Sequence, residues 1–300
     1  MSIEVIDFST EDGYKLHGLA YKNEKIKNKT LAIYIHGAGN SNVLNYGSLL
    51  SVIYKKLKKN NIDLMAFNNR GSGYISKINK YDSDGKLIAK KLAGMAYEKI
   101  EECVKDIDAA INWGLIQGYK NFTLIGHSTG ANKIVFYLSK KTKNSSFIAK
   151  VFLLAGGDDI YLQTSRLNNL EQYRKKIKSN IKLGHENDLV PADQFPGDHP
   201  ISYASLYELI SENSDYDIFP FKRFDVDNKE DFYLFKKINI PVIAIYGSED
   251  FGTIIPVRNA VRILKQINRL VKTVIIENAD HNFTNKYDEL AAVISEYISQ

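Results

Sequence analysis

The stretch FTLIGHSTGANKIVFYL, Phe122–Leu138, places a serine between two glycines at the junction of two apolar segments. The apolar run before Gly126 is typical of a buried strand, and the apolar residues after Gly130 recur with the spacing of a helix face. A tight turn that contains an incidental serine would fit this pattern. A serine raised out of the turn into a pocket would fit it as well, so other parts of the chain have to separate the two.

The five residues Gly126-His127-Ser128-Thr129-Gly130 fit the pattern G-x-S-x-G. A strand before this pattern and a helix after it are typical of a nucleophile elbow. We expect so sharp a turn to leave no room for a side chain at either glycine. The first turn of the following helix offers unpaired N–H groups and a positive potential where an oxyanion would develop. Ser128 is therefore the predicted nucleophile.

Two residues far along the chain could activate that serine. A serine hydroxyl needs a base that takes its proton, and the base needs a carboxylate that orients it. Asp250 follows a strand expected to end at Tyr246, and His281 follows a strand expected to end at Ile276. Both side chains should therefore arrive at consecutive strand ends, in the order serine, acid, histidine. We predict that Ser128, Asp250 and His281 form a catalytic triad.

Short apolar runs alternate with longer segments of helical period along the chain. The expected strands are Ile3–Phe8, Leu16–Tyr21, Leu31–Ile35, Leu64–Phe67, Phe122–Ile125, Val151–Leu154, Val242–Tyr246 and Val274–Ile276, and the expected helices lie near Leu49–Lys59, Tyr97–Trp113, Asn132–Lys140, Val257–Ile267 and Tyr287–Ile298. This alternation predicts an α/β protein with a mostly parallel sheet and helices on both faces. The uninterrupted apolar run at Leu31–Ile35 indicates a central strand buried on both sides.

One long segment interrupts the alternation. From about Gly157 to Asp231 the chain is polar and irregular and contains several prolines. A structureless loop of that length would be unusual in a compact domain. We interpret residues 157–231 as an inserted cap segment that shapes the substrate pocket, and residues 1–156 and 232–300 as the core domain. The aromatic residues of the cap segment are expected to form its own small core in preference to lining a pocket; they are Tyr161, Tyr173, Phe195, Tyr203, Tyr207, Tyr216, Phe219 and Phe221.

Composition argues against several other classes of protein. The net charge of +5 is small and dispersed, so neither nucleic acid nor a membrane surface is an expected partner. No apolar run approaches the roughly 20 residues that span a bilayer, and the first residues show no signal peptide, which leads us to expect a cytoplasmic protein. The single Cys103 excludes an intramolecular disulfide and is expected to be a buried, inert thiol on a helix face.

Because of the elbow around Ser128 and the positions of Asp250 and His281, the chain resembles the α/β-hydrolase family over nearly its whole length. His36–Gly39 stands where the family builds half of its oxyanion hole, and Asn69–Gly73 is similar to the family's D-x-R-G-x-G loop. The resemblance implies an α/β-hydrolase fold of eight strands with a cap, and an oxyanion hole formed by the backbone N–H groups of Ala38 and Thr129. The elbow and Ile201–Leu206 also resemble a group of poorly characterised hydrolases that includes fungal siderophore-ester hydrolases.

The chain departs from the family pattern at one position, and neighbouring acids offer alternatives at another. Asn68 stands where the loop pattern has aspartate, so a carboxylate that anchors the loop is absent, and Arg70 is expected to be a structural anchor. Glu249 adjoins Asp250 and could be the triad acid instead, but the family's spacing favours Asp250. Asp280 is expected to form a turn beside His281.

The remaining histidines suggest no metal. His36 is expected to stabilise the oxyanion loop by hydrogen bonding, and His127 to pack or bond locally. His17, His185 and His199 lack metal-ligand spacing. No P-loop or dinucleotide fingerprint is present, so neither a metal nor an organic cofactor is predicted.

These expectations combine into a serine esterase. The predicted reaction is hydrolysis of a small or medium carboxylic ester through an acyl-enzyme on Ser128. Two alternatives stay open: a thioesterase, acyltransferase or cyclase that acts on a carrier-bound acyl chain or a secondary metabolite, and a binding protein that keeps the fold without the chemistry. The expected partner is a small-molecule ester or thioester. The sequence does not determine the substrate or the oligomeric state.

Overall fold

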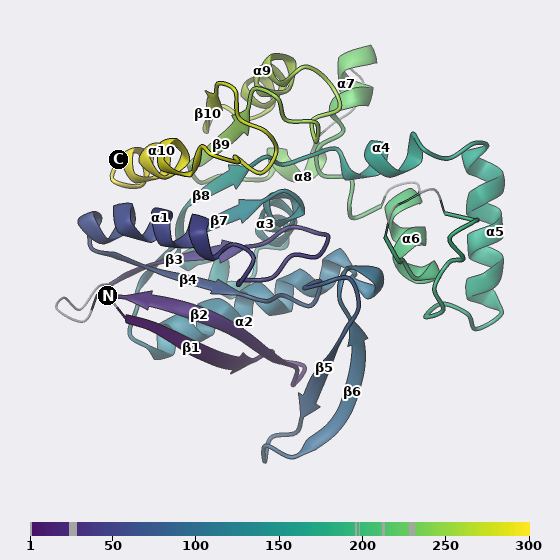
Figure 1. Ribbon diagram of the computed structural model, residues 1–300, viewed down its shortest axis with the longest axis horizontal. Coiled ribbons are helices and arrows are strands. Elements are labelled where there is room, and N and C mark those ends of the chain that lie inside the picture. Colours follow the sequence, from purple (N-terminus) through teal and green to yellow (C-terminus); the bar gives the residue numbers. More distant parts are fainter. Residues whose placement is uncertain (1, 24–28, 196, 198, 212–213, 228–231) are drawn as a thin grey trace.

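The computed structural model describes residues 2–23, 29–195, 197, 199–211, 214–227 and 232–300. Its centre is an eight-stranded sheet in the order β1-β2-β4-β3-β7-β8-β9-β10 (Figure 1). The strands are β1 (Ser2–Ser9), β2 (Lys15–Lys22), β3 (Thr30–Ile35), β4 (Ile62–Phe67), β7 (Asn121–His127), β8 (Ile148–Leu154), β9 (Val242–Gly247) and β10 (Val271–Ile276). Strand β2 pairs antiparallel with β1 and β4, and the other neighbouring strands of this eight-stranded sheet pair parallel. The predicted strands and the mostly parallel sheet are confirmed.

Helices cover both faces of this sheet and create two apolar cores (Figure 1). Helices α2 (Cys103–Ile116), α3 (Thr129–Ser139), α8 (Tyr233–Lys236) and α9 (Val257–Ile267) contribute to one core, and α1 (Gly47–Leu57) and α10 (Tyr287–Ile298) to the other. Strand β3 shows why the sequence needs an unbroken apolar run, since successive side chains point to opposite faces. Leu31 and Ile33 join the first core, whereas Ala32 and Tyr34 join the second.

A two-stranded hairpin of β5 (Ser76–Tyr81) and β6 (Leu87–Ala93) extends from the body of the molecule (Figure 1). The sequence did not predict this hairpin because both strands are rich in lysine and contain only one buried residue between them. Tyr14 tethers its base: Tyr14 forms a β-bridge with Lys80, and the charged ends of Lys80, Lys91 and Arg70 lie within 5.8 Å of the Tyr14 ring centroid. Short 3-10 helices occupy Lys58–Asn60, Met95–Tyr97, Ile100–Glu102 and Lys143–Phe147.

The cap segment is helical. It contains α4 (Asp159–Thr164), α5 (Leu170–Lys182), α6 (Tyr203–Ile210) and α7 (Phe221–Asp227), and α4 to α6 lie to one side of the sheet (Figure 1). A small apolar cluster packs α5 against α6. Its boundaries as a domain stay a prediction, and Asp231, its last predicted residue, lies outside the described residues.

The aromatic residues of the cap segment do not share one core. Phe195 and Tyr203 belong to its own cluster, as predicted. Phe219 and Phe221 instead stack 5.5 Å apart within the first core, which also contains Tyr216, so the prediction was wrong for these three residues. Tyr216 also lines the cavity described below. Composition reveals that an aromatic residue will be buried, but not which cluster receives it.

Within the described part of the chain, no helix has both the length and the apolar character needed to cross a membrane.

Candidate active site

Ser128 stands at the sharp turn between β7 and α3. Its backbone has φ 56° and ψ −131°, a combination that side-chain-bearing residues rarely adopt and that stores strain. A Cβ at Gly126 would lie 2.4 Å from the Gly130 carbonyl oxygen, and a Cβ at Gly130 would lie 2.2 Å from the Ile35 oxygen. Both positions therefore require glycine, as the sequence predicted for a nucleophile elbow.

The three residues predicted as a triad form one hydrogen-bonded chain. His281 Nε2 lies 2.9 Å from Ser128 Oγ, and His281 Nδ1 lies 2.7 Å from Asp250 Oδ1. Asp250 is buried, and the Gly252 N–H donates to the same oxygen at 2.8 Å. With Nδ1–H donating to Asp250, Nε2 is free to accept the serine proton. The geometry suits a base and its orienting acid, and the catalytic roles themselves stay a prediction.

The neighbouring acids take other positions. Glu249 is exposed, and its backbone N–H donates to the Ala279 carbonyl. Asp280 Oδ1 accepts hydrogen bonds from the backbone N–H groups of Asn282 at 3.0 Å and Thr284 at 2.8 Å. Asp280 is therefore the turn former that the sequence predicted.

Two rings flank the His281 imidazole. The exposed Phe251 ring lies 4.6 Å from it, between centroids, a contact that the sequence analysis did not anticipate. The His127 ring lies 5.3 Å away, and His127 Nε2 lies 2.9 Å from the His281 carbonyl oxygen. Burial, together with the nearby His281, lowers the pKa of His127 to about 4, so Nε2 donates as part of a neutral ring. His127 packs against the rings of Tyr46 and Phe283, in line with the prediction that it packs, and its hydrogen bond reaches a distant loop and connects the elbow to His281.

The loop after β3 passes directly over Ser128. A Cβ on Gly37 would lie 2.8 Å from Ser128 Cβ. His36 holds this loop: its Nδ1–H donates to the Gly37 carbonyl at 2.8 Å, and its Nε2 accepts the Asn69 N–H at 3.2 Å. Burial lowers the pKa of His36 to about 3, which keeps the ring neutral and suited to both bonds. The expected stabilising role of His36 is confirmed.

Ala38 and Thr129, the predicted oxyanion-hole residues, both line the cavity that contains Ser128. Thr129 is the first residue of α3, where the backbone N–H has no acceptor within the helix. Whether these two N–H groups bind an oxyanion stays a prediction.

The loop after β4 is anchored without the aspartate of the family pattern. Asn68 Oδ1 accepts the Val43 N–H at 2.8 Å, so an amide oxygen makes the contact that a carboxylate would make. Arg70 is buried and pairs with Asp106 at 2.8 Å and with Asp12 at 2.7 Å. The prediction that Arg70 is a structural anchor is confirmed.

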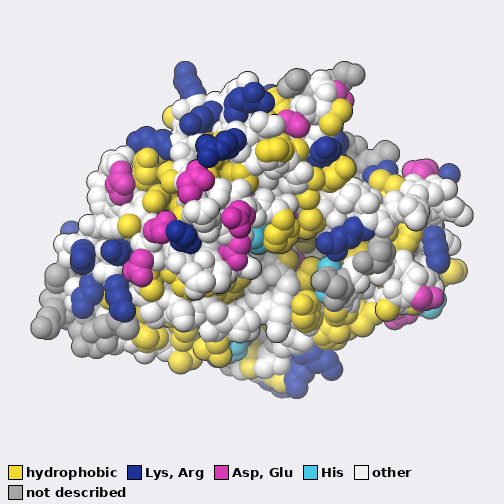
Figure 2. Space-filling view, turned by 45° about the horizontal axis from the view of Figure 1, so that its top comes forward, with side chains coloured by type: hydrophobic (Ala, Val, Ile, Leu, Met, Phe, Trp, Pro, Cys, Tyr) yellow, Lys and Arg dark blue, Asp and Glu magenta, His cyan; other side chains and the backbone are white. Residues whose placement is uncertain are grey.

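A cavity of about 340 Å³ opens above Ser128 and His281 between the core and the cap segment. Figure 2 shows this face, where hydrophobic side chains and histidines gather around a central hollow. Leu162, Leu209 and Tyr216 of the cap segment supply part of the wall.

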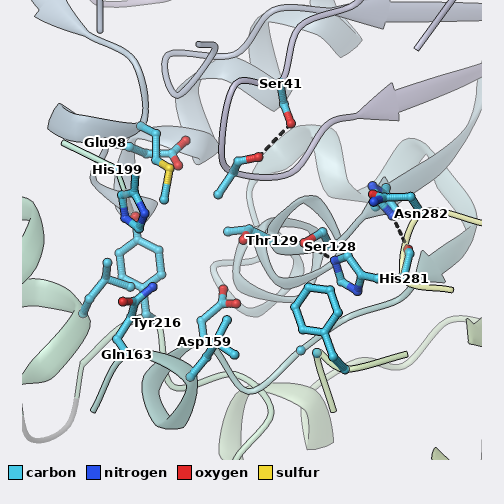
Figure 3. Close-up of a pocket in the computed structure, with 18 of the residues that line it drawn as sticks. Ser41, Glu98, Ser128, Thr129, Asp159, Gln163, His199, Tyr216, His281 and Asn282 are labelled. Atoms are coloured by element: carbon cyan, nitrogen blue, oxygen red, sulfur yellow. Dashed lines mark hydrogen bonds between the residues drawn. The ribbon is translucent and has the colours of Figure 1, made fainter. Parts of the chain in front are cut away.

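The polar residues of this cavity that the sequence did not indicate include Glu98, Asp159 and Gln163 (Figure 3). Glu98 forms an ion pair with Lys133, whose side chain is completely buried. Asp159 Oδ2 accepts the Asn132 amide at 2.9 Å, and burial raises the pKa of Asp159 to about 7. One feature of the sequence could have indicated Asp159: it follows shortly after the end of β8, at the edge of the sheet where Ser128 also lies.

Neither cysteine nor metal chemistry is indicated in the described residues. Cys103 is buried on α2 with its sulfur 3.6 Å from the Lys133 carbonyl oxygen, and burial raises the pKa of its thiol, as expected for an inert residue. Across the described ranges, no three His, Cys, Asp or Glu side chains gather closely enough to hold a metal ion.

Comparison with known proteins identifies the family and the fold of this chain. Residues 94–299, more than half of the chain, match the family described as "Protein of unknown function (DUF1749)". No curated protein sequence matches. Solved structures of similar fold include Est1E from Butyrivibrio proteoclasticus with bound ferulic acid (TM-score 0.62, 13% identity, 97% of each chain covered). They also include a thermostable carboxyl esterase from Bacillus coagulans (TM-score 0.63, 15% identity, covering 99% of this chain and 98% of that one).

A third similar structure is the esterase domain of a Rhodothermus marinus protein (TM-score 0.57, 14% identity, covering 100% of this chain and 97% of that one). At these low identities the likeness establishes the fold. The chain belongs to the DUF1749 family and has the α/β-hydrolase fold.

Proposed function

We propose that this protein is a serine hydrolase that cleaves a carboxylic ester of a small or medium organic substrate. The observation that carries the proposal is the hydrogen-bonded chain from Asp250 through His281 to Ser128, which ends in a cavity. The printed descriptions of the similar structures, two of them esterases and one a protein with bound ferulic acid, support the same reaction class.

The reaction proceeds in two similar halves. Ser128 Oγ attacks the ester carbonyl while His281 Nε2 takes its proton, and Asp250 stabilises the imidazolium. The N–H groups of Ala38 and Thr129 hold the negative oxygen of the tetrahedral intermediate. His281 then gives its proton to the leaving alcohol, and water repeats the sequence to release the acid and regenerate Ser128.

Hydrolysis of p-nitrophenyl esters of increasing chain length tests the proposal. Ser128→Ala should lower kcat by several orders of magnitude, since the acyl-enzyme can no longer form, while circular dichroism and thermal unfolding stay close to the parent protein. Adding alcohols or amines as acceptors separates hydrolysis from acyl transfer, and acyl thioesters test the thioesterase alternative. Full esterase activity in Ser128→Ala would contradict the assignment.

A further inference from the structure

Helix α4 presents two hydrogen-bonding side chains to the cavity. Asp159 and Gln163 stand four residues apart, which places them on the same face of the helix, and both line the cavity beside Ser128 (Figure 3). Two groups hold the Asp159 carboxylate in place: the Asn132 amide at 2.9 Å and the Thr129 side chain. Asp159 is therefore a fixed part of the wall next to the predicted nucleophile.

The charge of Asp159 has no cationic partner in the described part of the chain. No described lysine or arginine lies within ion-pair distance of its carboxylate; the buried Lys133 pairs with Glu98 instead. Arg166 also lines the cavity, but its side chain is exposed. Asp159 is half-buried, and desolvation raises its pKa to about 7, so its ionised form is disfavoured while none of the described lysines and arginines pairs with it. A cationic group of a ligand would stabilise the ionised carboxylate.

Gln163 provides a second, independent indication of the ligand's chemistry, because its side-chain oxygen lacks a hydrogen-bond donor among the described residues. It is 7% exposed, and its Oε1 is buried and accepts no hydrogen bond from the described residues. Buried carbonyl oxygens are nearly always paired with a donor. A donor group in the cavity, reached by a rotation of the amide, would satisfy it.

The position of these groups identifies the part of the substrate that they meet. His281 protonates the leaving alcohol, so the alcohol departs on the His281 side of Ser128. Figure 3 shows Gln163 and Tyr216 on the other side of Ser128 from His281. This end of the cavity therefore receives the acyl group.

We propose that the acyl group of the substrate carries a protonated amine, which binds the Asp159 carboxylate and donates a further hydrogen bond to Gln163. An ammonium group supplies both the positive charge and the several N–H donors that these two side chains lack. The apolar Leu162 and Leu209 contact the methylene groups that connect the amine to the ester. This inference rests on the proposed function, because it concerns the substrate of the same site.

Pairs of p-nitrophenyl esters that differ only in the terminal group test the inference. The β-alanyl and ε-aminohexanoyl esters carry an ammonium group where the butanoyl and heptanoyl esters carry a methyl group. We expect kcat/KM for the better ammonium ester to exceed that of its methyl counterpart by about tenfold, the scale of one charge-assisted hydrogen bond. Asp159→Asn should remove this preference while the methyl esters are still hydrolysed. Asp159→Glu should retain part of it.

Arg166→Gln is the matched control, since it removes a charge from the same wall and should not reduce the preference. A second measurement needs no variant: propylammonium should inhibit butanoyl ester hydrolysis more strongly than propanol does. Equal or lower kcat/KM for both ammonium esters, or an unchanged preference in Asp159→Asn, would overturn the inference. Failure to hydrolyse any of the four esters would overturn the proposed function itself, and the inference with it.

Discussion

We predict that Lys133→Met lowers the free energy of unfolding by about 3 kcal/mol, the lower end of the range for breaking a buried ion pair. Lys133 lies on α3 with its side chain completely buried, and Glu98 is 7% exposed. Methionine fills much of the space of lysine but leaves the Glu98 carboxylate without its cation. Asn69 Oδ1, which accepts a hydrogen bond from Lys133 Nζ at 3.3 Å, also loses a donor. We choose the lower end because Glu98 borders the cavity, where water can partly solvate it.

The assay is thermal and urea unfolding at neutral pH, followed by circular dichroism. A loss of about 3 kcal/mol should lower Tm by roughly 5 °C in a chain of this size. The double variant Lys133→Met with Glu98→Gln should lose less free energy of unfolding than the two single variants lose in sum. The difference, which is the coupling energy of the pair, should be about 1–3 kcal/mol. A Lys133→Met protein within about 1 kcal/mol of the parent would refute the view that this pair is electrostatically coupled and buried.

Three further predictions concern the elbow and the base. Gly130→Ala should destabilise the protein by about 1–3 kcal/mol or prevent folding, because its Cβ would meet the Ile35 oxygen at 2.2 Å; unfolding curves check this, and a parent-like curve would contradict it. Asp250→Asn should lower kcat by about four orders of magnitude at unchanged stability, since the imidazole would lose its orienting charge; ester kinetics with a kcat near that of the parent would contradict it. His127 is neutral when folded because its pKa is lowered to about 4, so the unfolded chain takes up its proton first as pH falls. The free energy of unfolding should therefore fall as the pH is lowered from about 6.5 to about 4. Urea titrations should show a smaller fall over this pH range in His127→Asn than in the parent protein, and an equal fall would contradict the prediction.

The sheet and the triad geometry were accessible from sequence because they depend on local patterns. An unbroken apolar run such as Leu31–Ile35 is needed wherever both faces of a strand are covered. Parallel strands end at one edge of the sheet, so residues that follow those strands, such as Asp250 and His281, are brought near Ser128 by topology alone.

Features that depend on tertiary contacts were not accessible. The β5–β6 hairpin has no apolar alternation, and its base is held by Tyr14 from another part of the chain. Phe219 and Phe221 were assigned to the wrong core because burial alone does not identify a partner. Asp159 belongs to no motif, and its importance follows from the cavity that surrounds it.

Reaction of the protein with a fluorophosphonate probe, followed by mass spectrometry of the labelled peptide, tests the central claim most directly. A serine activated by a neighbouring imidazole reacts with such probes, whereas an ordinary surface serine does not. We expect one adduct, located on Ser128 within Phe122–Leu138, and we expect His281→Ala to abolish it while the protein remains folded. A folded protein that forms no adduct, or one that is labelled at another serine, would contradict the proposal that Ser128, His281 and Asp250 act as a catalytic unit.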